Sequence, residues 1–544
     1  MERAEHQDVI VVGGGPVGMG LAIDLAQRGM RVLVLEKYPS PQLIPKGQNL
    51  TQRTMEHFRA WNAEDELRAA KTVPASFGIG GMTAYGTLLG KYHYDWLKRE
   101  LVRDFYAADN ERLPQYQTEA VLRARAADLP NIRLLAGYEA EDVAEDDSGV
   151  TVTARRREDG GTDSFRAAWC VGADGSRSVV REAAKLGQTV FDHDRTMVLL
   201  VFQSDKLHQR LMEKHPGKSF LNVLHPDLKG YWLFFGRVDL EGEFFFHAPI
   251  PADADPETFD FHDYVQKAVG EPIDMEIRHR GFWDCRVAIA ESYGRGRVFI
   301  AGDAAHNHPP YGGYGINTGF EDARNLGWKL AAVHDGWAGP ELLTSYDLER
   351  RPVFWSTAKD YIEKAIETDR DFLAAYNPDT DLAAFEEAWN GRGSNASADV
   401  DAFQPNYRGS PVVDGARDGT ADAVFPHSFE ARPGFHLAPR DLSDGKTLFD
   451  LQDGGFSLIA LGREADADAF RTAAAQAGIP LQVMTADPEG QARDYGAALV
   501  LVRPDCFVSW VGDSVDLATA TDALATSCGA GAPAEAQGLR RAAS

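Results

Sequence analysis

The chain has 544 residues and a formal net charge of −26, and 44% of its residues are hydrophobic. This length exceeds one simple core, so we expect two to four folded units. The acidic balance argues against partners such as nucleic acid or an anionic membrane surface, because both require basic patches. The first residues lack a signal-peptide pattern, and no run of about 18 apolar residues occurs. We therefore expect a cytoplasmic protein without a membrane span.

The cysteines and histidines do not form a metal-binding pattern. Four cysteines are scattered without a CxxC pair or a histidine at zinc-ligand spacing, which predicts unpaired thiols in a reducing compartment. His306 and His308 stand close together, but no carboxylate cluster accompanies them. We therefore predict no metal site.

The first chemical motif lies between Asp8 and Lys37, where the pattern predicts a strand, a tight turn, a helix and a second strand. The turn holds a G-x-G-x-x-G motif. Its first glycine permits the turn, its second lets a pyrophosphate approach the helix N-terminus, and its third lets helix and strand pack closely. A carboxylate at the end of the second strand can accept hydrogen bonds from ribose hydroxyls. The predicted dinucleotide contacts are Gly13, Gly15, Pro16, Val17, Gly18, Glu36 and Lys37. This motif alone does not separate NAD from FAD.

Two further motifs follow in order. An apolar strand leads into Asp174-Gly175, and another leads into Gly302-Asp303. The three motifs together resemble the fingerprints of the single-component flavin-dependent aromatic hydroxylases, the group built like para-hydroxybenzoate hydroxylase and phenol hydroxylase. The resemblance covers nearly the whole chain. It implies non-covalent FAD, NADPH or NADH as electron donor, dioxygen as co-substrate and a C4a-hydroperoxyflavin.

The resemblance also assigns residues to FAD. It implies that Asp303 accepts hydrogen bonds from the ribityl chain beside Gly302, and that Asp174 has a partly structural role. Lys46 and either Gln115 or Gln117 match positions that contact FAD in the family, which usually has arginine where Lys46 stands. Lysine offers a point charge rather than a planar fork. Arg53 could compensate, or it could be an exposed arginine at a helix start.

The segment from Pro309 to Asn317 precedes a predicted helix and is rich in glycine. The resemblance implies that backbone amides here face the flavin, and the predicted contacts are Pro310, Gly313, Gly315, Ile316 and Asn317. Pro309 and Pro310 are predicted to form a rigid wall beside the reacting atoms. Gln48 is the candidate for orienting a substrate hydroxyl or carbonyl, since an amide cannot act as a base. For His306 we expect a structural hydrogen bond rather than proton transfer.

The predicted fold class is α/β. It comprises a Rossmann-type FAD-binding domain with an inserted antiparallel β-sheet substrate domain, followed by a thioredoxin-like C-terminal domain. The expected boundaries are 1–189 and 284–375 for the FAD-binding domain, 190–283 for the substrate domain, 376–432 for a wrapping linker and 433–544 for the C-terminal domain. The last domain lacks CxxC, so we expect a packing or dimer role and a homodimer. Cys506 stands where relatives commonly have glycine, and we expect a small buried residue there.

The substrate domain is rich in aromatic residues, some of which should line an aromatic-binding pocket while the others form its core. These are Trp232, Phe234, Phe244 and Phe246, and the polar candidates for holding substrate are Asn222, His225, Tyr231 and His247.

The sequence thus predicts hydroxylation of a phenolic or hydroxylated heteroaromatic substrate, with secondary metabolism as its setting. Two alternatives remain open. One is Baeyer–Villiger or epoxidation tailoring of a polyketide with the same cofactor. The other is a flavin-binding protein without catalysis.

Overall fold

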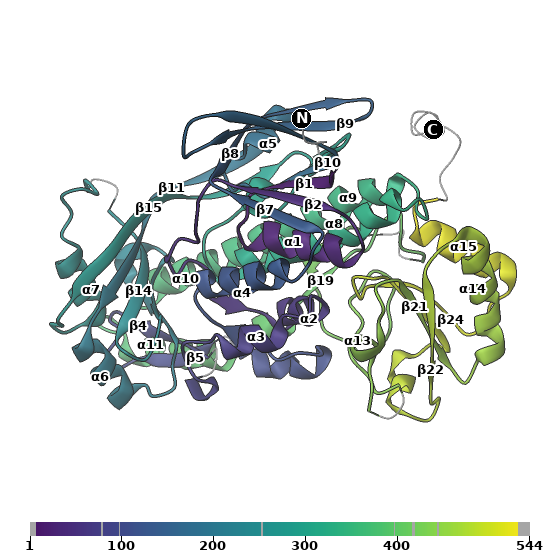
Figure 1. Cartoon of the computed structure of the whole chain (residues 1–544). Helices are drawn as coiled ribbons and strands as arrows, with labels where there is room; N and C mark the ends of the chain where they lie inside the picture. Colours follow the sequence, from purple (N-terminus) through teal and green to yellow (C-terminus); the bar gives the residue numbers. More distant parts are fainter. Residues whose placement is uncertain are drawn as a thin grey trace.

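A computed structural model describes residues 7–77, 80–96, 98–251, 254–395, 398–415, 419–442 and 445–530. Figure 1 shows three parts side by side. A central α/β layer is flanked on one side by a large twisted sheet, and on the other by the C-terminal domain, drawn in yellow-green. Among the described residues, no helix is long and apolar enough to cross a membrane.

The central layer is built on a parallel sheet of buried apolar strands. Strands β17, β10, β1, β2 and β7 are parallel neighbours in that order. All six residues of β1 are buried, as expected of a parallel strand covered on both faces. The strands of this sheet are β16 (Gly294–Arg295), β17 (Val298–Ile300), β10 (Thr162–Gly172), β1 (Gln7–Val12), β2 (Val32–Glu36) and β7 (Ile132–Ala136), with β8 (Tyr138–Asp146) and β9 (Gly149–Arg156) attached through β10.

Helices cover this sheet and carry the turns that build the site. Helix α1 (Pro16–Gln27) follows β1 directly and packs against the long helix α8 (Tyr314–His334). Around them lie α2 (Gln52–Ala60), α3 (Glu64–Ala69), α4 (Gln115–Ala127), α5 (Val179–Ala183) and α9 (Glu341–Ser356), which continues through a π-helical turn (Thr357–Glu363) into α10 (Lys364–Ala375).

The second sheet forms the wall opposite the central layer (Figure 1). Its order is β18 (His306–Asn307), β15 (Glu276–Ala290), β11 (Gln188–Gln203), β14 (Glu243–Pro249), β13 (Trp232–Arg237), β12 (Phe220–Leu224), β4 (Gly81–Tyr85) and β5 (His93–Trp96). Helices α6 (Asp205–Lys214) and α7 (Phe261–Val269) belong to the same part.

This sheet differs from the expected antiparallel insertion in two respects. The pair β12–β4 is parallel, so the sheet is mixed. Strands β4 and β5 come from within residues 1–189, which the sequence assigned to the FAD-binding domain. The short segment around β4 and β5 carries no strong periodicity, and only its pairing with β12 makes it part of the substrate wall.

The segment 376–432 is more than a linker. It contains helix α11 (Leu382–Asn395), α12 (Ala398–Asp401) and the antiparallel pair β19 (Phe403–Asn406) and β20 (Asp422–Val424). Phe385 and Trp389 of α11 are buried with Phe372 of α10 and Leu224 of β12. This aromatic packing stabilises a helix that its own sequence pattern did not indicate.

The C-terminal domain has the thioredoxin topology. A βαβ unit of β21 (Phe456–Leu461), α14 (Glu464–Ala477) and β22 (Leu481–Ala486) precedes a hairpin of β23 (Leu499–Val502) and β24 (Val508–Gly512), and α15 (Leu517–Ser527) follows. The sheet order is β22-β21-β23-β24, with β23 antiparallel to both neighbours. This confirms the predicted α/β fold class with its thioredoxin-like end.

Candidate active site

A cavity of about 660 Å³ lies between the central layer and the second sheet. One end is bounded by the glycine turn after β1, the end of β10, and the segment that leads into α8. The other end is walled by aromatic side chains of β5, β12, β13, β14 and β15. No residue after Ile316 lines this cavity in the described part of the chain. The C-terminal domain therefore takes no direct part in its walls.

The glycines of the first motif shape the turn as the pattern predicts. A Cβ at Gly13 would lie 2.3 Å from the carbonyl oxygen of Ala173, and a Cβ at Gly18 would lie 2.0 Å from the carbonyl oxygen of Gly13. Gly15 lines the cavity, and a Cβ there would meet no atom within 4 Å. Two glycines thus serve packing within the protein, while the third leaves space for a group that approaches the backbone.

Two helix N-termini open into this cavity. Gly15, the N-cap of α1, and Gly313, the N-cap of α8, both line it, and neither helix has a side-chain cap. The unsatisfied N–H groups and helix dipoles therefore place two positive ends at one cavity. A dinucleotide pyrophosphate and an electron-rich ring edge are the groups this arrangement accommodates. The cradle fits FAD.

Glu36 lies next to the glycine turn at the end of β2. Its Oε2 accepts a hydrogen bond from Gly14 N at 2.7 Å, and its Oε1 accepts one from Tyr38 N at 2.8 Å. Each carboxylate oxygen retains a second lone pair for a ribose hydroxyl. Lys37 is exposed, with its ammonium 5.3 Å from the centre of the Tyr38 ring, and does not line the cavity.

Asp303, Lys46 and Gln115 come together at the cavity from three separate segments. Asp303 is exposed to the cavity, and the protein around it raises the pKa of its carboxyl group by partial desolvation, while His306 and Lys46 oppose that rise. Gln115 accepts a hydrogen bond from Gly47 N at 3.3 Å, whereas Gln117 does not line the cavity. Of the two glutamines left open by the sequence, Gln115 is the one that lines the cavity.

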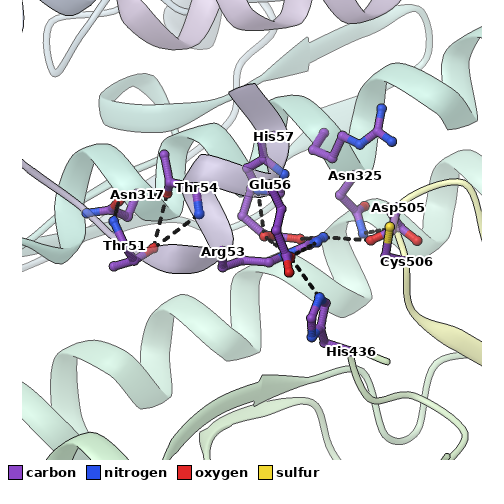
Figure 2. Close-up of polar contacts among 12 residues, drawn as sticks. Thr51, Arg53, Thr54, Glu56, His57, Asn317, Asn325, His436, Asp505 and Cys506 are labelled. Carbon is purple, nitrogen blue, oxygen red and sulfur yellow. Dashed lines mark hydrogen bonds and ion pairs between the residues drawn. The ribbon is translucent and has the colours of Figure 1, made fainter. Parts of the chain in front are cut away.

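Several predicted contacts support the cavity without lining it. Gly302 N donates to Asp322 Oδ2 at 3.0 Å, and Asp174 Oδ2 accepts from Val180 N at 3.3 Å at the start of α5. The Asn317 side chain accepts from Thr51 N at 2.9 Å and so joins the first turn of α8 to the start of α2, as Figure 2 shows. Pro310 lines the cavity, whereas the preceding Pro309 is buried and does not line it.

Arg53 fits neither of the interpretations offered by the sequence. It is largely buried and does not line the cavity, and Figure 2 shows it directed toward Asp505 and Cys506 of the C-terminal domain. Its guanidinium pairs with Glu56 and Glu321 at 3.0 Å and donates to Asp505 O at 2.6 Å. Arg53 therefore does not compensate for Lys46. Only the tertiary structure reveals its carboxylate partner on α8.

The two histidines have different surroundings. His306 Nε2 contacts Asp322 Oδ2 at 2.7 Å, and Asp322 also accepts from Arg350 Nε at 2.8 Å, which gives His306 a structural hydrogen bond. His308 lines the cavity, and its Nδ1 contacts Pro309 O while its Nε2 has no partner among the described residues. Burial lowers the pKa of His308 to about 4, so its ring is neutral at pH 7. Among the described residues, no His, Cys, Asp and Glu side chains gather as a metal site would require.

The substrate-side wall is aromatic. Along β14, Phe245 and His247 face the cavity, whereas Phe244 and Phe246 point into the core of the second sheet. This alternation is the ordinary two-residue period of a strand. The aromatic wall consists of Trp96, Phe220, Trp232, Phe234, Phe245, His247, Phe282 and Trp283.

Of the four polar candidates, only His247 lines the cavity. Burial lowers its pKa to about 4, and its Nδ1 has no partner among the described residues. Tyr231 contacts His193 Nδ1 at 2.8 Å, His225 accepts from Asp227 N, and the buried Asn222 lies outside the lining.

Sequence reasoning missed Trp96, His279, Trp283 and Arg112, which lie at or behind the cavity wall. Trp96 lies on β5 and Trp283 on β15, and no motif marks either strand. The one sequence signal that could have indicated a wall strand was the alternation of aromatic and polar residues that ends at Trp96.

Comparison with known proteins agrees with this architecture. Residues 6–360 match the family model described as "FAD binding domain", and residues 430–531 match "Aromatic-ring hydroxylase, C-terminal". The chain is 31% identical to 4-methyl-5-nitrocatechol 5-monooxygenase of Burkholderia sp, over 95% of this chain and 96% of that protein. It is 35% identical to a putative polyketide hydroxylase of Streptomyces halstedii, over 92% of each chain.

Solved structures show the same fold. The rebeccamycin biosynthetic enzyme RebC with reduced flavin superposes with a TM-score of 0.82 at 26% identity, over 96% of this chain and 99% of that one. A ternary complex of aklavinone-11 hydroxylase with FAD and aklavinone gives 0.81 at 26% identity, over 97% and 100%. The chain belongs to the FAD-binding aromatic-ring hydroxylase family. It is an FAD-dependent aromatic monooxygenase.

Proposed function

We propose that this protein hydroxylates a phenolic or hydroxylated polycyclic aromatic substrate, with NADPH or NADH as electron donor and dioxygen as co-substrate. One observation carries the proposal. A single cavity joins a cradle of two helix N-termini to a chamber walled by aromatic rings. Ring faces and edges recognise an aromatic substrate, and the adjoining cradle holds the cofactor within reach of it.

When bound, FAD supplies the electron transfer and the activation of dioxygen. The chain supplies binding, orientation and exclusion of water. Asp303 and Gln115 hold the cofactor chain, and the N–H groups at the start of α8 stabilise negative charge that develops beside Gly315 and Ile316. Pro310 and Tyr311 form the wall where cofactor and substrate meet, and Tyr311 is fixed by accepting a hydrogen bond from Trp232 N at 3.2 Å.

The relatives support both small and large aromatic substrates. The Burkholderia relative is named for a nitrocatechol, and the Streptomyces relative for a polyketide. The largely apolar wall, with only a few polar atoms, suits a flat ring system with one or two oxygen substituents.

The test is a screen of the purified, FAD-containing protein against phenols, catechols and aromatic polyketides. We expect NADPH or NADH oxidation to accelerate with a substrate and the product to gain the mass of one oxygen atom. The position of that oxygen, determined by NMR, separates ring hydroxylation from insertion beside a carbonyl or epoxidation. A protein that binds no flavin, or that never oxidises NADPH or NADH faster with any aromatic compound, would overturn the proposal.

A further inference from the structure

Arg112 is a buried cation at the back of the substrate wall. It ends the short strand β6 (Glu111–Arg112), which pairs with β3 (Asn49–Leu50), and only 2% of its surface is exposed. None of the ion pairs found among the described residues includes Arg112. Its guanidinium carbon lies 4.8 Å from the centre of the Phe220 ring, which itself lines the cavity.

Among the described residues, the guanidinium of Arg112 makes one side-chain hydrogen bond, and it goes to Gln48. Arg112 Nη2 donates to Gln48 Oε1 at 2.7 Å, while Arg112 Nε and Nη1 have no partner in the described part of the chain. An arginine has no acceptor, so Gln48 must present its carbonyl oxygen to it. The orientation of the Gln48 amide is thereby fixed, and its NH₂ group is turned away from Arg112.

The amide nitrogen of Gln48 is a donor without an acceptor. Gln48 lines the cavity and is 4% exposed, and its Nε2 makes no hydrogen bond within the described residues. A buried donor of this kind costs free energy unless a ligand satisfies it. Its bond to a guanidinium polarises the amide, which makes the N–H a stronger donor.

The electrostatics of the surroundings favour a negative ligand atom. Burial lowers the pKa of Arg112 to about 9, with Arg237 acting in the same direction and Asp239 and Glu111 opposing it, so Arg112 stays charged at pH 7. The titratable side chains that line the cavity in the described part of the chain are Lys46, His247, His279, Asp303, His308 and Tyr311.

We propose that Gln48 and Arg112 together select the ionised, phenolate form of the substrate. Gln48 Nε2 donates to the phenolate oxygen, and Arg112 is a positioning residue that orients Gln48 and stabilises the negative charge through it. The proton of the phenol leaves to solvent as the substrate binds, so no protein base is required. This inference rests on the proposed function, because it concerns the substrate of that reaction.

The experiment follows the ionisation of a bound probe. The FAD-containing protein is titrated with 4-nitrophenol at a series of pH values, and visible absorption reports the phenolate. We expect the pKa of the bound probe to lie about one unit below its value in solution, equivalent to about tenfold tighter binding of the phenolate. Gln48→Leu and Arg112→Met should abolish this shift. Gln48→Glu places a carboxylate at the same point and should raise the pKa of the bound probe above its solution value.

Arg99→Met is the matched control, because Arg99 is also buried without an ion pair among the described residues but, unlike Arg112, makes no hydrogen bond there to Gln48. It should keep the wild-type shift in the pKa of the bound probe.

FAD content and thermal unfolding verify that each variant folds. Gln48→Glu, which can pair with Arg112, tests the inference even if Arg112→Met fails to fold. An unshifted probe in the wild type, absence of probe binding, or a shift that survives in the Gln48 variants would overturn the inference. Failure of the proposed function would appear separately, as absence of flavin or of substrate-stimulated NADPH or NADH oxidation.

Discussion

At the scale of single residues, Cys506 shows why the position favours glycine. It sits at the tip of the β23–β24 hairpin with φ of 67°, in the left-handed region that side chains with a Cβ disfavour. It is buried, and its Sγ lies 3.4 Å from Gln452 Oε1. Figure 2 shows Cys506 beside Asp505, at the contact with α2 and α8. Strain is thus tolerated where the C-terminal domain meets the central layer.

Replacing Cys506 with glycine should stabilise the protein by up to about 1 kcal/mol, because it relieves the left-handed strain. Chemical denaturation followed by fluorescence measures the change. Cys506→Ala retains a Cβ and the strain, so it should bring no gain. Equal stabilisation by both variants would show that backbone strain is not the cause.

His247 makes stability depend on pH. Burial lowers the pKa of its imidazole from the ordinary 6.5 to about 4. Between these values the unfolded chain binds a proton that the folded protein does not, so stability falls as pH drops from about 6.5 to about 4. The contribution of this one group is roughly 3 kcal/mol at the lower limit.

His247→Phe should therefore flatten the dependence of unfolding free energy on pH between pH 4 and 6.5, relative to the wild type. Measurement consists of denaturant titrations at several pH values. His225→Phe is the control, because His225 is about a third exposed and caps a short helix. If the unfolding free energies of His247→Phe and of the wild type changed in parallel with pH, the buried neutral ring of His247 would not be the source of the pH dependence.

At the scale of elements, the N-termini of α1 and α8 define the cofactor cradle. Their positions follow from two strand-to-helix connections, one after β1 and one after β18. The glycine motif was enough to predict the first connection from the sequence. The second connection could be predicted only through the family resemblance, because glycine-rich segments alone do not specify a helix start.

Gly15→Ala should separate folding from cofactor binding. Its φ of −74° suits any residue, and a Cβ would touch no protein atom within 4 Å, so the apoprotein should fold normally. The added methyl group would occupy the space for the pyrophosphate. We expect FAD affinity to fall at least about tenfold, which corresponds to about 1.4 kcal/mol.

Flavin fluorescence titration of the apoprotein measures this affinity. Gly391→Ala on α11 is the matched control, since a Cβ there also meets no atom within 4 Å and the site is remote from the cavity lining. Unchanged FAD affinity in Gly15→Ala would contradict the assigned role of Gly15.

At the scale of the whole molecule, a buried polar network holds the C-terminal domain against α8 and α9. Arg503 pairs with Glu349 at 2.7 Å and with Asp505 at 2.6 Å, and Lys329 pairs with Glu349 at 2.6 Å. All four side chains are fully buried. Burial lowers the pKa of Lys329 to about 8, whereas Arg503 and Lys329 hold the pKa of Glu349 well below its ordinary value. No described C-terminal residue lines the cavity, so this domain acts on the site only through the elements it contacts, which include α2, α8 and α9.

Glu349→Leu should destabilise the protein by about 3–5 kcal/mol, because it leaves the two buried cations Lys329 and Arg503 with Asp505 as their one anionic partner among the described residues. Thermal unfolding and limited proteolysis between residues 376 and 432 would report the loss. Glu386→Gln removes an exposed pair with Lys91 and should cost less than about 1 kcal/mol. Similar losses of stability in both variants would show that the buried network contributes no more to stability than an exposed ion pair.

Local patterns in the sequence determined the chemistry at the cofactor end. The G-x-G-x-x-G turn, Asp303 and the glycines before α8 are contiguous motifs, and short-range geometry is enough to place their backbone atoms against a ligand. The fold class followed from the same motifs and from the alternation of strands and helices near the C-terminus.

Only the tertiary structure decided the substrate end. Trp96 and Arg112 lie more than 100 residues before Phe220 on β12, and the pairing of β4 with β12 brings β5 and Trp96 into the aromatic wall. Arg53 does not reach the cavity, because its guanidinium forms an ion pair with Glu321, which lies 268 residues away in the sequence. Strand pairing and buried ion pairs join residues that have no fixed spacing in the sequence. A local sequence pattern therefore could not predict these contacts.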